Sequence, residues 1–211
     1  DQGCKITFND EPEEISEIFR DPGSVNRVIV VYTPAIPEEN MILSFFRKKN
    51  YRIFKRSEIL GEISLHTDTL AVAGTHGKTT ISTMVAHLLK QSHIDCSAFL
   101  GGISKNYGTN LILGESNYTV MEADEFDRSF HRLSPLMAVI TSVDADHLDI
   151  YGNQTAMIEA YNEFILKIRK GGTLFVNASI TGRIIVPKGL QCFTYSSSED
   201  ADYRAVNIRH E

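Results

Sequence analysis

The stretch "AVAGTHGKTT", residues 71–80, constrains this chain most, because it joins an apolar run directly to a glycine-rich turn. An apolar strand, a glycine loop and a following helix are the context in which many proteins bind phosphate. The N–H groups of such a loop and the positive end of the helix dipole both face the anion. The stretch therefore predicts a phosphate-binding turn in an α/β fold.

Individual residues of this loop have expected roles. Gly74 and Gly77 let the backbone approach a phosphate, because neither carries a Cβ. Lys78 can reach the β- and γ-phosphates, and the Thr79 hydroxyl can bind Mg²⁺. The standard G-x-x-x-x-G-K-[ST] pattern would begin at Val72, so the loop departs from it, and an ordinary strand-to-helix turn is the alternative. The candidate phosphate-binding residues are Gly74, Thr75, His76, Gly77, Lys78, Thr79 and Thr80.

The composition fits a globular protein and disfavours two classes of partner. With 211 residues, 42% hydrophobic and 23% charged, the chain can bury a sizeable core. Its net charge of −6 disfavours nucleic acid, whose phosphates need a basic face. No apolar run approaches the roughly 18 residues of a membrane span. The scattered cysteines, Cys4, Cys96 and Cys192, predict a reducing compartment, most simply the cytoplasm.

The first 66 residues alternate strand and helix signals, which predicts a layered α/β unit. The expected elements are a strand at 4–8, a helix at 11–19, a strand at 27–32, a helix at 36–50, a strand at 51–56 and a helix at 57–64. Ser57 is a candidate cap of the last helix. The expected core residues of the second helix are Met41, Ile42, Phe45 and Phe46.

A second unit begins near residue 68, and we place the domain boundary between residues 66 and 67. The expected strands lie at 69–74, 118–123, 136–143, 173–178 and 191–196, with a strand from 96 that turns at Gly101-Gly102. Helices are expected at 78–91 and 154–172. The first should bury its apolar positions, Ile81, Met84, Val85, Leu88 and Leu89. The predicted fold is α/β, a partial Rossmann-like domain (1–66) followed by a phosphate-loop, mostly parallel sheet with flanking helices (67–211).

Two further strand ends carry acidic residues. The first is "EADE", residues 122–125, and the second is "DADHLD", residues 144–149. Because ligands of open parallel sheets bind beyond the carboxyl ends of the strands, both motifs should lie beside the glycine loop. Carboxylates there would hold the Mg²⁺ of a nucleoside triphosphate. The alternatives are a solvated strand end for Glu122, helix capping or turn chemistry for Asp144 and Asp146, and a structural role for His147.

These motifs in combination resemble the Mur ligase family, the ATP-dependent ligases of peptidoglycan precursor synthesis. The resemblance runs from about residue 4 to the end of the chain. The matching stretches are "AVAGTHGKTT", "LGGISKNYGTN", "VMEADEFDRSF", "AVITSVDADHLDIYG" and "YSSSEDADYRAVNI". Upstream, "VIVVYTPAIPEEN" and "YRIFKRSEILGEI" are similar to the later half of the family's N-terminal domain.

The resemblance implies a reaction and roles for particular residues. ATP would phosphorylate the lactyl carboxylate of UDP-N-acetylmuramate, and the amine of L-alanine would attack the acyl phosphate. Lys78 would neutralise charge on the transferring group, while Gly74 to Thr80 hold the phosphates. Thr79 and Glu122 would bind one Mg²⁺, and Glu122 and His147 a second. Asp124 and Glu125 would orient these ligands.

The resemblance also implies a domain plan and leaves other functions open. The family has a UDP-binding, an ATP-binding and a C-terminal domain. We expect 1–66 to be part of the first and 67–211 a truncated second, so that the chain alone is inactive. The second hypothesis is a muropeptide-recycling ligase that attaches a tripeptide. A nucleotide-hydrolysing module without a second metal site and a noncatalytic sugar-nucleotide-binding domain are the others.

Overall fold

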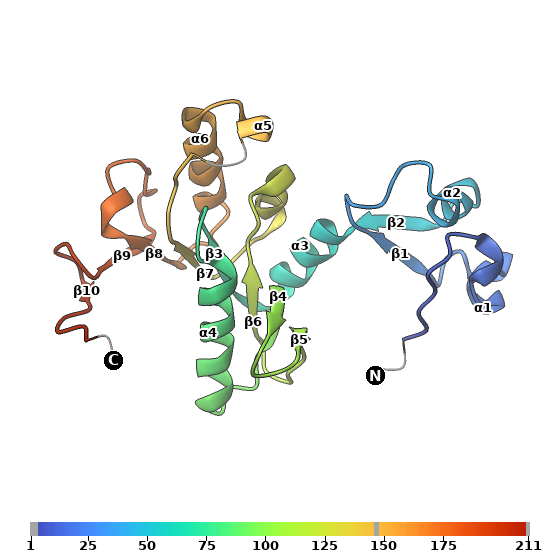
Figure 1. Cartoon of the computed structure of the whole chain (residues 1–211), viewed down its shortest axis with the longest axis horizontal. Helices are drawn as coiled ribbons and strands as arrows, with labels where there is room; N and C mark the ends of the chain where they lie inside the picture. The colour runs from blue at the N-terminus through green and yellow to red at the C-terminus, as the bar shows by residue number, and fades with distance from the viewer. Residues whose placement is uncertain (1–3, 146–147, 210–211) are drawn as a thin grey trace. The chain divides into compact units, whose positions relative to one another are not determined.

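The structure, a computed structural model, describes residues 4–145 and 148–209 of the chain. It divides into two compact units, unit 1 up to Leu60 and unit 2 from Gly61 onward (Figure 1). The division falls within helix α3 (Arg56–His66). Across the described parts of the chain, no helix has the length and apolar character that crossing a membrane requires.

Unit 1 is built around a two-stranded parallel sheet. Strand β1 (Ile29–Tyr32) pairs with β2 (Arg52–Lys55), so the predicted strands at 27–32 and 51–56 are confirmed with shorter bounds. Helix α2 (Met41–Lys48) connects them, and its first turn is capped by Asn40, whose Oδ1 accepts from Leu43 N at 2.9 Å.

The expectations for the first twenty residues of unit 1 are mostly wrong. Residues 4–8 form no strand, because they have no neighbouring strand with which to pair. The predicted helix at 11–19 is broken into a 3-10 turn η1 (Pro12–Glu14) and the short α1 (Glu17–Arg20), since Ile15 is extended between them. A further 3-10 turn, η2, covers Pro22–Ser24.

Two expectations about the helices of unit 1 also need correction. Helix α2 buries Leu43 and Phe46, whereas Met41, predicted to be core, is 52% exposed. The buried stripe is shifted because Phe46 packs edge-on against the ring of Tyr51, at 4.9 Å between centroids. Ser57 caps nothing, because α3 already begins at Arg56.

Unit 2 is a single eight-stranded sheet in the order β10-β9-β8-β7-β3-β6-β4-β5 (Figure 1). All neighbouring pairs are parallel except β4 and β5, which are antiparallel. The predicted α/β class with a mostly parallel sheet is therefore confirmed. The strands are β3 (Asp68–Ala73), β4 (Ser97–Ser104), β5 (Thr109–Ile112), β6 (Tyr118–Glu122), β7 (Met137–Ile140), β8 (Thr173–Asn177), β9 (Gln191–Ser196) and β10 (Tyr203–Arg204).

The centre of the sheet is apolar and covered on both faces. Ala71, Val72 and Ala73 of β3 have at most 1% of their surface exposed. Val120 of β6 and Ala138 of β7, on either side, are fully buried. Continuous apolar runs of this kind are typical of parallel strands that carry helices on both faces.

Helix α4 (Lys78–Gln91) packs against β3, β4 and β6, and its predicted bounds are confirmed. Its predicted buried face is partly wrong, since Met84 and Leu88 are 58% and 64% exposed. The small residues Ser82 and Ala86 are buried instead. Small side chains let the helix lie close to the sheet, and the longer apolar residues are displaced to its flanks.

Helix α6 (Gln154–Ile165) ends six residues before the predicted stop at Gly171-Gly172. Beyond Ile165 the chain makes tighter turns, and Arg169 N then donates to Pro135 O at 2.9 Å. This tertiary bond ends the helix earlier than the glycines would. The remaining helical segments are η3 (Phe126–Arg132), α5 (Leu148–Tyr151) and η4 (Ala178–Ile180).

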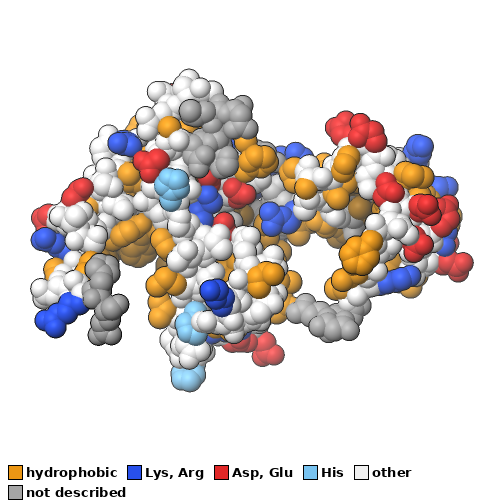
Figure 2. Space-filling view, viewed as in Figure 1, with side chains coloured by type: hydrophobic (Ala, Val, Ile, Leu, Met, Phe, Trp, Pro, Cys, Tyr) orange, Lys and Arg blue, Asp and Glu red, His pale blue; other side chains and the backbone are white. Residues whose placement is uncertain are grey.

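Unit 1 leaves more apolar surface exposed than the centre of unit 2 does. Figure 2 shows hydrophobic side chains on the surface of unit 1 among charged ones. In β1, Ile29 is 51% exposed and Val31 is 48% exposed. The two-stranded sheet of unit 1 therefore carries less cover than the sheet of unit 2.

Candidate nucleotide and metal site

Three neighbouring strand ends of unit 2 carry the predicted motifs. Strand β3 lies between β6 and β7 and is parallel to both. In register, Val72 pairs with Glu122, and Ala73 pairs with Ile140. The glycine loop, Glu122 and the segment after β7 consequently meet at one edge of the sheet, as the sequence predicts.

Gly74 has a conformation and surroundings that only glycine satisfies. Its φ is +129°, and a Cβ there would lie 2.0 Å from Thr141 Oγ1. That hydroxyl lies 2.5 Å from His76 O and 3.3 Å from Ala73 O, so it holds the loop from below. Gly77, with φ +81°, forms the N-cap of α4. The loop thus turns tightly enough to place its lysine on the first turn of the helix.

The segment after β7 fixes the rest of the loop. Thr75 N donates to Ser142 O at 3.2 Å, and the two side-chain hydroxyls are 2.7 Å apart. His76 N donates to Ser142 Oγ at 3.1 Å, and Asp144 N donates to Thr75 Oγ1 at 3.2 Å. The buried Thr75 and the amide of His76 therefore shape the loop, and their polar groups are already bonded to protein. The His76 imidazole is exposed, 3.8 Å from the carboxylate of Asp144.

Lys78 is bound in a buried ion pair. Its Nζ donates to Gly74 O at 2.9 Å and lies 2.9 and 2.8 Å from the two carboxylate oxygens of Glu125. The Lys78 side chain is 13% exposed and that of Glu125 is fully buried. Tyr151 holds the backbone of Glu125 by donating its hydroxyl to the carbonyl oxygen at 2.5 Å. The lysine therefore stays at the helix N-terminus, beside the loop.

Glu125 is the residue whose role the sequence understates. The motif suggests an orienting group near the metal ligands, but the structure makes it the direct partner of Lys78, 47 positions away in the chain. A signal was present, because a carboxylate three residues past a buried strand needs a cation if it is buried itself. Its neighbour Asp124 accepts from Phe126 N at 3.1 Å and shapes the turn into η3.

Thr79 and Glu122 bring two oxygen atoms together at a spacing that fits two ligands of Mg²⁺. Thr79 Oγ1 donates to Glu122 Oε1 at 3.0 Å, and Gly101 N donates to the other carboxylate oxygen at 2.8 Å. Adjacent ligands of an octahedral Mg²⁺, each at about 2.1 Å from the ion, lie roughly 3 Å apart. The spacing of the two oxygens matches that edge of the octahedron.

The remaining ligands of such an ion would come from elsewhere. Over residues 4–145 and 148–209, no group of three or more histidine, cysteine or acidic side chains could hold a metal. Mg²⁺ usually keeps several waters and binds through one or two protein oxygens plus substrate phosphates. The predicted ligand His147 lies outside the described residues. Thr80 is exposed on the first turn of α4.

A cavity of about 650 Å³, lined mostly by residues with polar side chains, lies further along the same edge. Burial raises the pKa of the Tyr195 phenol, whose hydroxyl donates to Ile140 O at 3.4 Å, so it stays neutral. Hydrogen bonds from Thr194 lower the pKa of Asp202, with the backbone N–H contributing more than the side-chain hydroxyl. The cavity is lined by Asn177, Tyr195, Ser196, Ser197, Asp202, Tyr203, Arg204 and Ala205.

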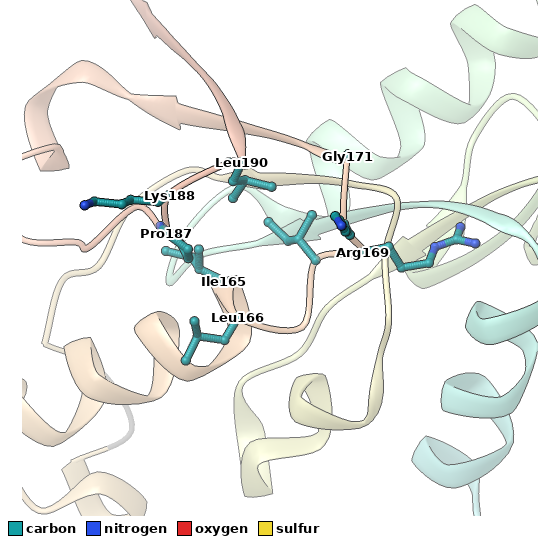
Figure 3. Close-up of a pocket in the computed structure, with 10 residues that line it drawn as sticks. Ile165, Leu166, Arg169, Gly171, Pro187, Lys188 and Leu190 are labelled. Carbon is teal, nitrogen blue, oxygen red and sulfur yellow. The ribbon is translucent and has the colours of Figure 1, made fainter.

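A second cavity, of about 350 Å³, lies before the amino ends of β8 and β9 and so on the opposite edge (Figure 3). Figure 3 shows Arg169 and Lys188 pointing away from each other. Arg169 donates to Thr67 O at 2.6 Å and lies 3.6 Å from Asp68, so its charge is used within the fold. This cavity has no part in the candidate site.

Unit 2 is an α/β domain of the phosphate-loop class. Its defining features are strand β3, the glycine loop, Lys78 and the paired oxygens of Thr79 and Glu122. The chain belongs to the Mur ligase family, because the protein-family model described as "Mur ligase middle domain" matches residues 72–211. The family resemblance read from the motifs is thereby confirmed.

Curated relatives match the chain over nearly its whole length. A protein of Phocaeicola vulgatus named UDP-N-acetylmuramate--L-alanine ligase is 50% identical over 99% of this chain and 45% of its own length. A protein of the same name from Flavobacterium johnsoniae is 46% identical over 100% of this chain and 44% of its own. The chain thus spans slightly less than half the length of these relatives.

Solved structures share the fold. The UDP-N-acetylmuramate-alanine ligase MurC of Thermotoga maritima is 28% identical, with a TM-score of 0.68 over 83% of this chain and 40% of its own. The UDP-N-acetylmuramate:L-alanyl-gamma-D-glutamyl-meso-diaminopimelate ligase of Neisseria meningitides has a TM-score of 0.69 at 21% identity, over 83% of this chain and 61% of its own. The second likeness shows the fold alone.

Proposed function

We propose that the protein containing this chain is an ATP-dependent ligase that joins L-alanine to the lactyl carboxylate of UDP-N-acetylmuramate in peptidoglycan precursor synthesis. The observation that carries the proposal is the meeting of the phosphate loop, Lys78 and the Thr79–Glu122 pair at one sheet edge. Relatives about 50% identical that bear this ligase's name support the choice of substrates. ATP as co-substrate suits a cytoplasmic enzyme.

The proposed chemistry has two steps. A carboxylate oxygen of UDP-N-acetylmuramate attacks the γ-phosphorus of ATP, which forms an acyl phosphate and releases ADP. The nitrogen of L-alanine then attacks the acyl carbon, and the tetrahedral intermediate collapses to an amide and inorganic phosphate. Because two anions must meet in the first step, the protein must neutralise charge and align the groups.

The residues of the edge suit this task. Lys78 would neutralise the transferring phosphoryl group from its place on the first turn of α4. Glu125 would hold the Lys78 side chain beside the loop, because its fully buried carboxylate lies 2.8 Å from Lys78 Nζ. The positive end of α4 and the glycine loop, Gly74 to Thr80, would hold the remaining phosphate oxygens.

Mg²⁺ belongs to the proposal through Thr79 and Glu122, whose oxygens would hold it beside the phosphates. When bound, the ion supplies Lewis-acid neutralisation of phosphate charge. By family resemblance, His147 and Glu122 would hold a second Mg²⁺ near the substrate carboxylate. The domain roles follow the same resemblance, with 1–66 contributing to the UDP-substrate domain and 67–211 to the ATP-binding domain.

The test is phosphate release from ATP by the full-length gene product that carries this sequence. The assay contains Mg²⁺ and UDP-N-acetylmuramate, and compares L-alanine with the tripeptide L-alanyl-γ-D-glutamyl-meso-diaminopimelate. The proposal expects release that depends on L-alanine. Release only with the tripeptide would assign the recycling ligase instead, and release indifferent to both acceptors would leave a nucleotide hydrolase.

A further inference from the structure

Strand β4 continues through Gly101 and Gly102 to Ser104, where the sequence predicts a turn. Its pairing with β6 ends at Phe99 and Met121. Beyond that point, Gly101 N donates to the side chain of Glu122, with 2.8 Å between the nitrogen and Oε2. A side chain of β6 thus takes the place of a backbone acceptor in the ladder.

Glycine at position 101 leaves room for that side chain in its present position. A Cβ there would lie 2.4 Å from both carboxylate oxygens of Glu122 and 2.5 Å from its Cδ. The φ of Gly101 is outside the left-handed region, so the backbone itself would accept alanine. The absence of a Cβ at Gly101 therefore makes room for the Glu122 carboxylate, and it is not needed for a turn.

The neighbouring glycine, Gly102, lies close to the methyl group of Thr79. A Cβ on Gly102 would lie 3.3 Å from Thr79 Cγ2. Of the two consecutive glycines of β4, only Gly101 lies against a proposed ligand group, the carboxylate of Glu122. With Glu122 Oε2 held by Gly101 N, Oε1 is left at 3.0 Å from Thr79 Oγ1, in the position that fits the ion.

We propose that Gly101 is a positioning residue of the Mg²⁺ site, which holds Glu122 beside Thr79 through its N–H and through the absence of a Cβ. The inference rests on the proposed function for the role of Glu122 as a ligand. Groups that orient metal ligands change metal affinity by about 10–100-fold when they are altered. A methyl group at position 101 would turn the carboxylate away from Thr79 and lower the affinity for the ion.

The contact is tested by a double-mutant cycle of thermal unfolding, measured without metal or nucleotide. Gly101→Ala should lower Tm by about 2–6 °C in the presence of Glu122. In a Glu122→Ala background, Gly101→Ala should change Tm by less than about 1 °C, because the carboxylate that the new methyl group would meet is gone. Gly182→Ala, whose Cβ would meet open space, is the matched control. An equal loss in both backgrounds would overturn the proposed contact.

Steric and electrostatic causes separate in a third background. Glu122→Gln keeps the size of the side chain, so Gly101→Ala should still lower Tm there. If Glu122→Ala does not fold, Glu122→Ser replaces it in the cycle, because its short side chain also clears the space beside position 101. No loss in the Glu122→Gln background would contradict the steric account.

The role in metal binding is tested with Mn²⁺ as the probe, by measuring free Mn²⁺ by electron paramagnetic resonance in the presence of ADP and the full-length protein. We expect Gly101→Ala to weaken Mn²⁺ binding about 10–100-fold, while Gly182→Ala binds like the parent. Unchanged Mn²⁺ affinity in Gly101→Ala would overturn the positioning role. The metal-free cycle decides the contact even if the L-alanine assay fails, so the two proposals fail separately.

Discussion

Both units contain a strand with a continuous apolar sequence, but the side chains of the two strands are buried to different extents. "RVIVVY" in unit 1 and "TLAVAG" in unit 2 are both continuous apolar runs. In β3, Ala71 and Val72 are 1% exposed, whereas in β1, Ile29 and Val31 are about half exposed, at 51% and 48%. The difference comes from the neighbours, because β3 has strands on both sides and β1 has a single partner. A local pattern predicts a strand, but its cover is set by distant parts of the chain.

The polar groups of unit 2 likewise depend on distant parts of the chain. At the edge of unit 2, the loop, its lysine and its hydroxyls are held by residues 43 to 69 positions away. The interlocked edge should therefore respond strongly to single substitutions, while exposed residues of unit 1 should respond little. The predictions below test that contrast, from the largest expected effect to the smallest.

The largest effect is expected for Lys78→Met. The substitution removes the Lys78 ion pair from the fully buried carboxylate of Glu125, and the loss of one partner of such a pair typically costs about 3–5 kcal/mol. Activity of the full-length protein should fall by about 10²–10³-fold. The measurements are urea unfolding and phosphate release. The double variant Lys78→Met with Glu125→Gln should recover much of the stability and none of the activity; recovery of activity would contradict the role of the lysine.

Phe46→Ala tests whether unit 1 has a core of its own. Phe46 is 6% exposed and packs edge-on against Tyr51, so the substitution should cost about 3 kcal/mol in urea unfolding. The matched control is Phe8→Ala, because Phe8 is 98% exposed and its loss should change stability by less than about 0.5 kcal/mol. Similar losses for both phenylalanines would break the contrast drawn above.

Gly74→Ala should destabilise unit 2 by about 2 kcal/mol, from the clash with Thr141 Oγ1 and the left-handed φ. Gly189→Ala is the control, since its φ is also positive, at +86°, but a Cβ there meets open space. That substitution should cost about 1 kcal/mol. If chemical denaturation gives the same loss at both positions, crowding beneath the loop does not matter.

Thr141→Val is expected to have the smallest effect at the site. It keeps the shape of the side chain and removes the hydroxyl that contacts His76 O and Ala73 O. The loss of one hydrogen-bonding group should cost about 1 kcal/mol. A shift of the unfolding midpoint with unchanged slope would report it. No change would mean that the loop holds its shape without this hydroxyl.

The sequence predicts the elements that depend on local pattern. The helix at 78–91 and the strand at 191–196 have the bounds that their periodicity and flanking turns indicate. The motif-bearing strand ends meet because parallel topology brings carboxyl ends together. These features follow from short segments and a general rule of α/β sheets.

The features that the sequence mispredicts or understates depend on distant partners. Residues 4–8 have strand-like composition and no strand beside them. Helix α6 ends at Ile165, before its glycine signal, and Arg169 four residues later bonds to Pro135. The sequence predicts a turn at Gly101, but in the structure Gly101 lies within β4 and leaves room for the side chain of Glu122, 21 positions away. In each case the tertiary surroundings, present or missing, decide the structure against the local signal.

The most direct test of the account follows an oxygen atom from the substrate to phosphate. The full-length protein is given ATP, Mg²⁺, L-alanine and UDP-N-acetylmuramate labelled with ¹⁸O in the lactyl carboxylate. Because the carboxylate oxygen that attacks phosphorus leaves with it, the account predicts one ¹⁸O in each released phosphate, detected by mass spectrometry. Phosphate free of label would mean that water attacks the nucleotide, and would contradict the proposal that this sheet edge activates a carboxylate.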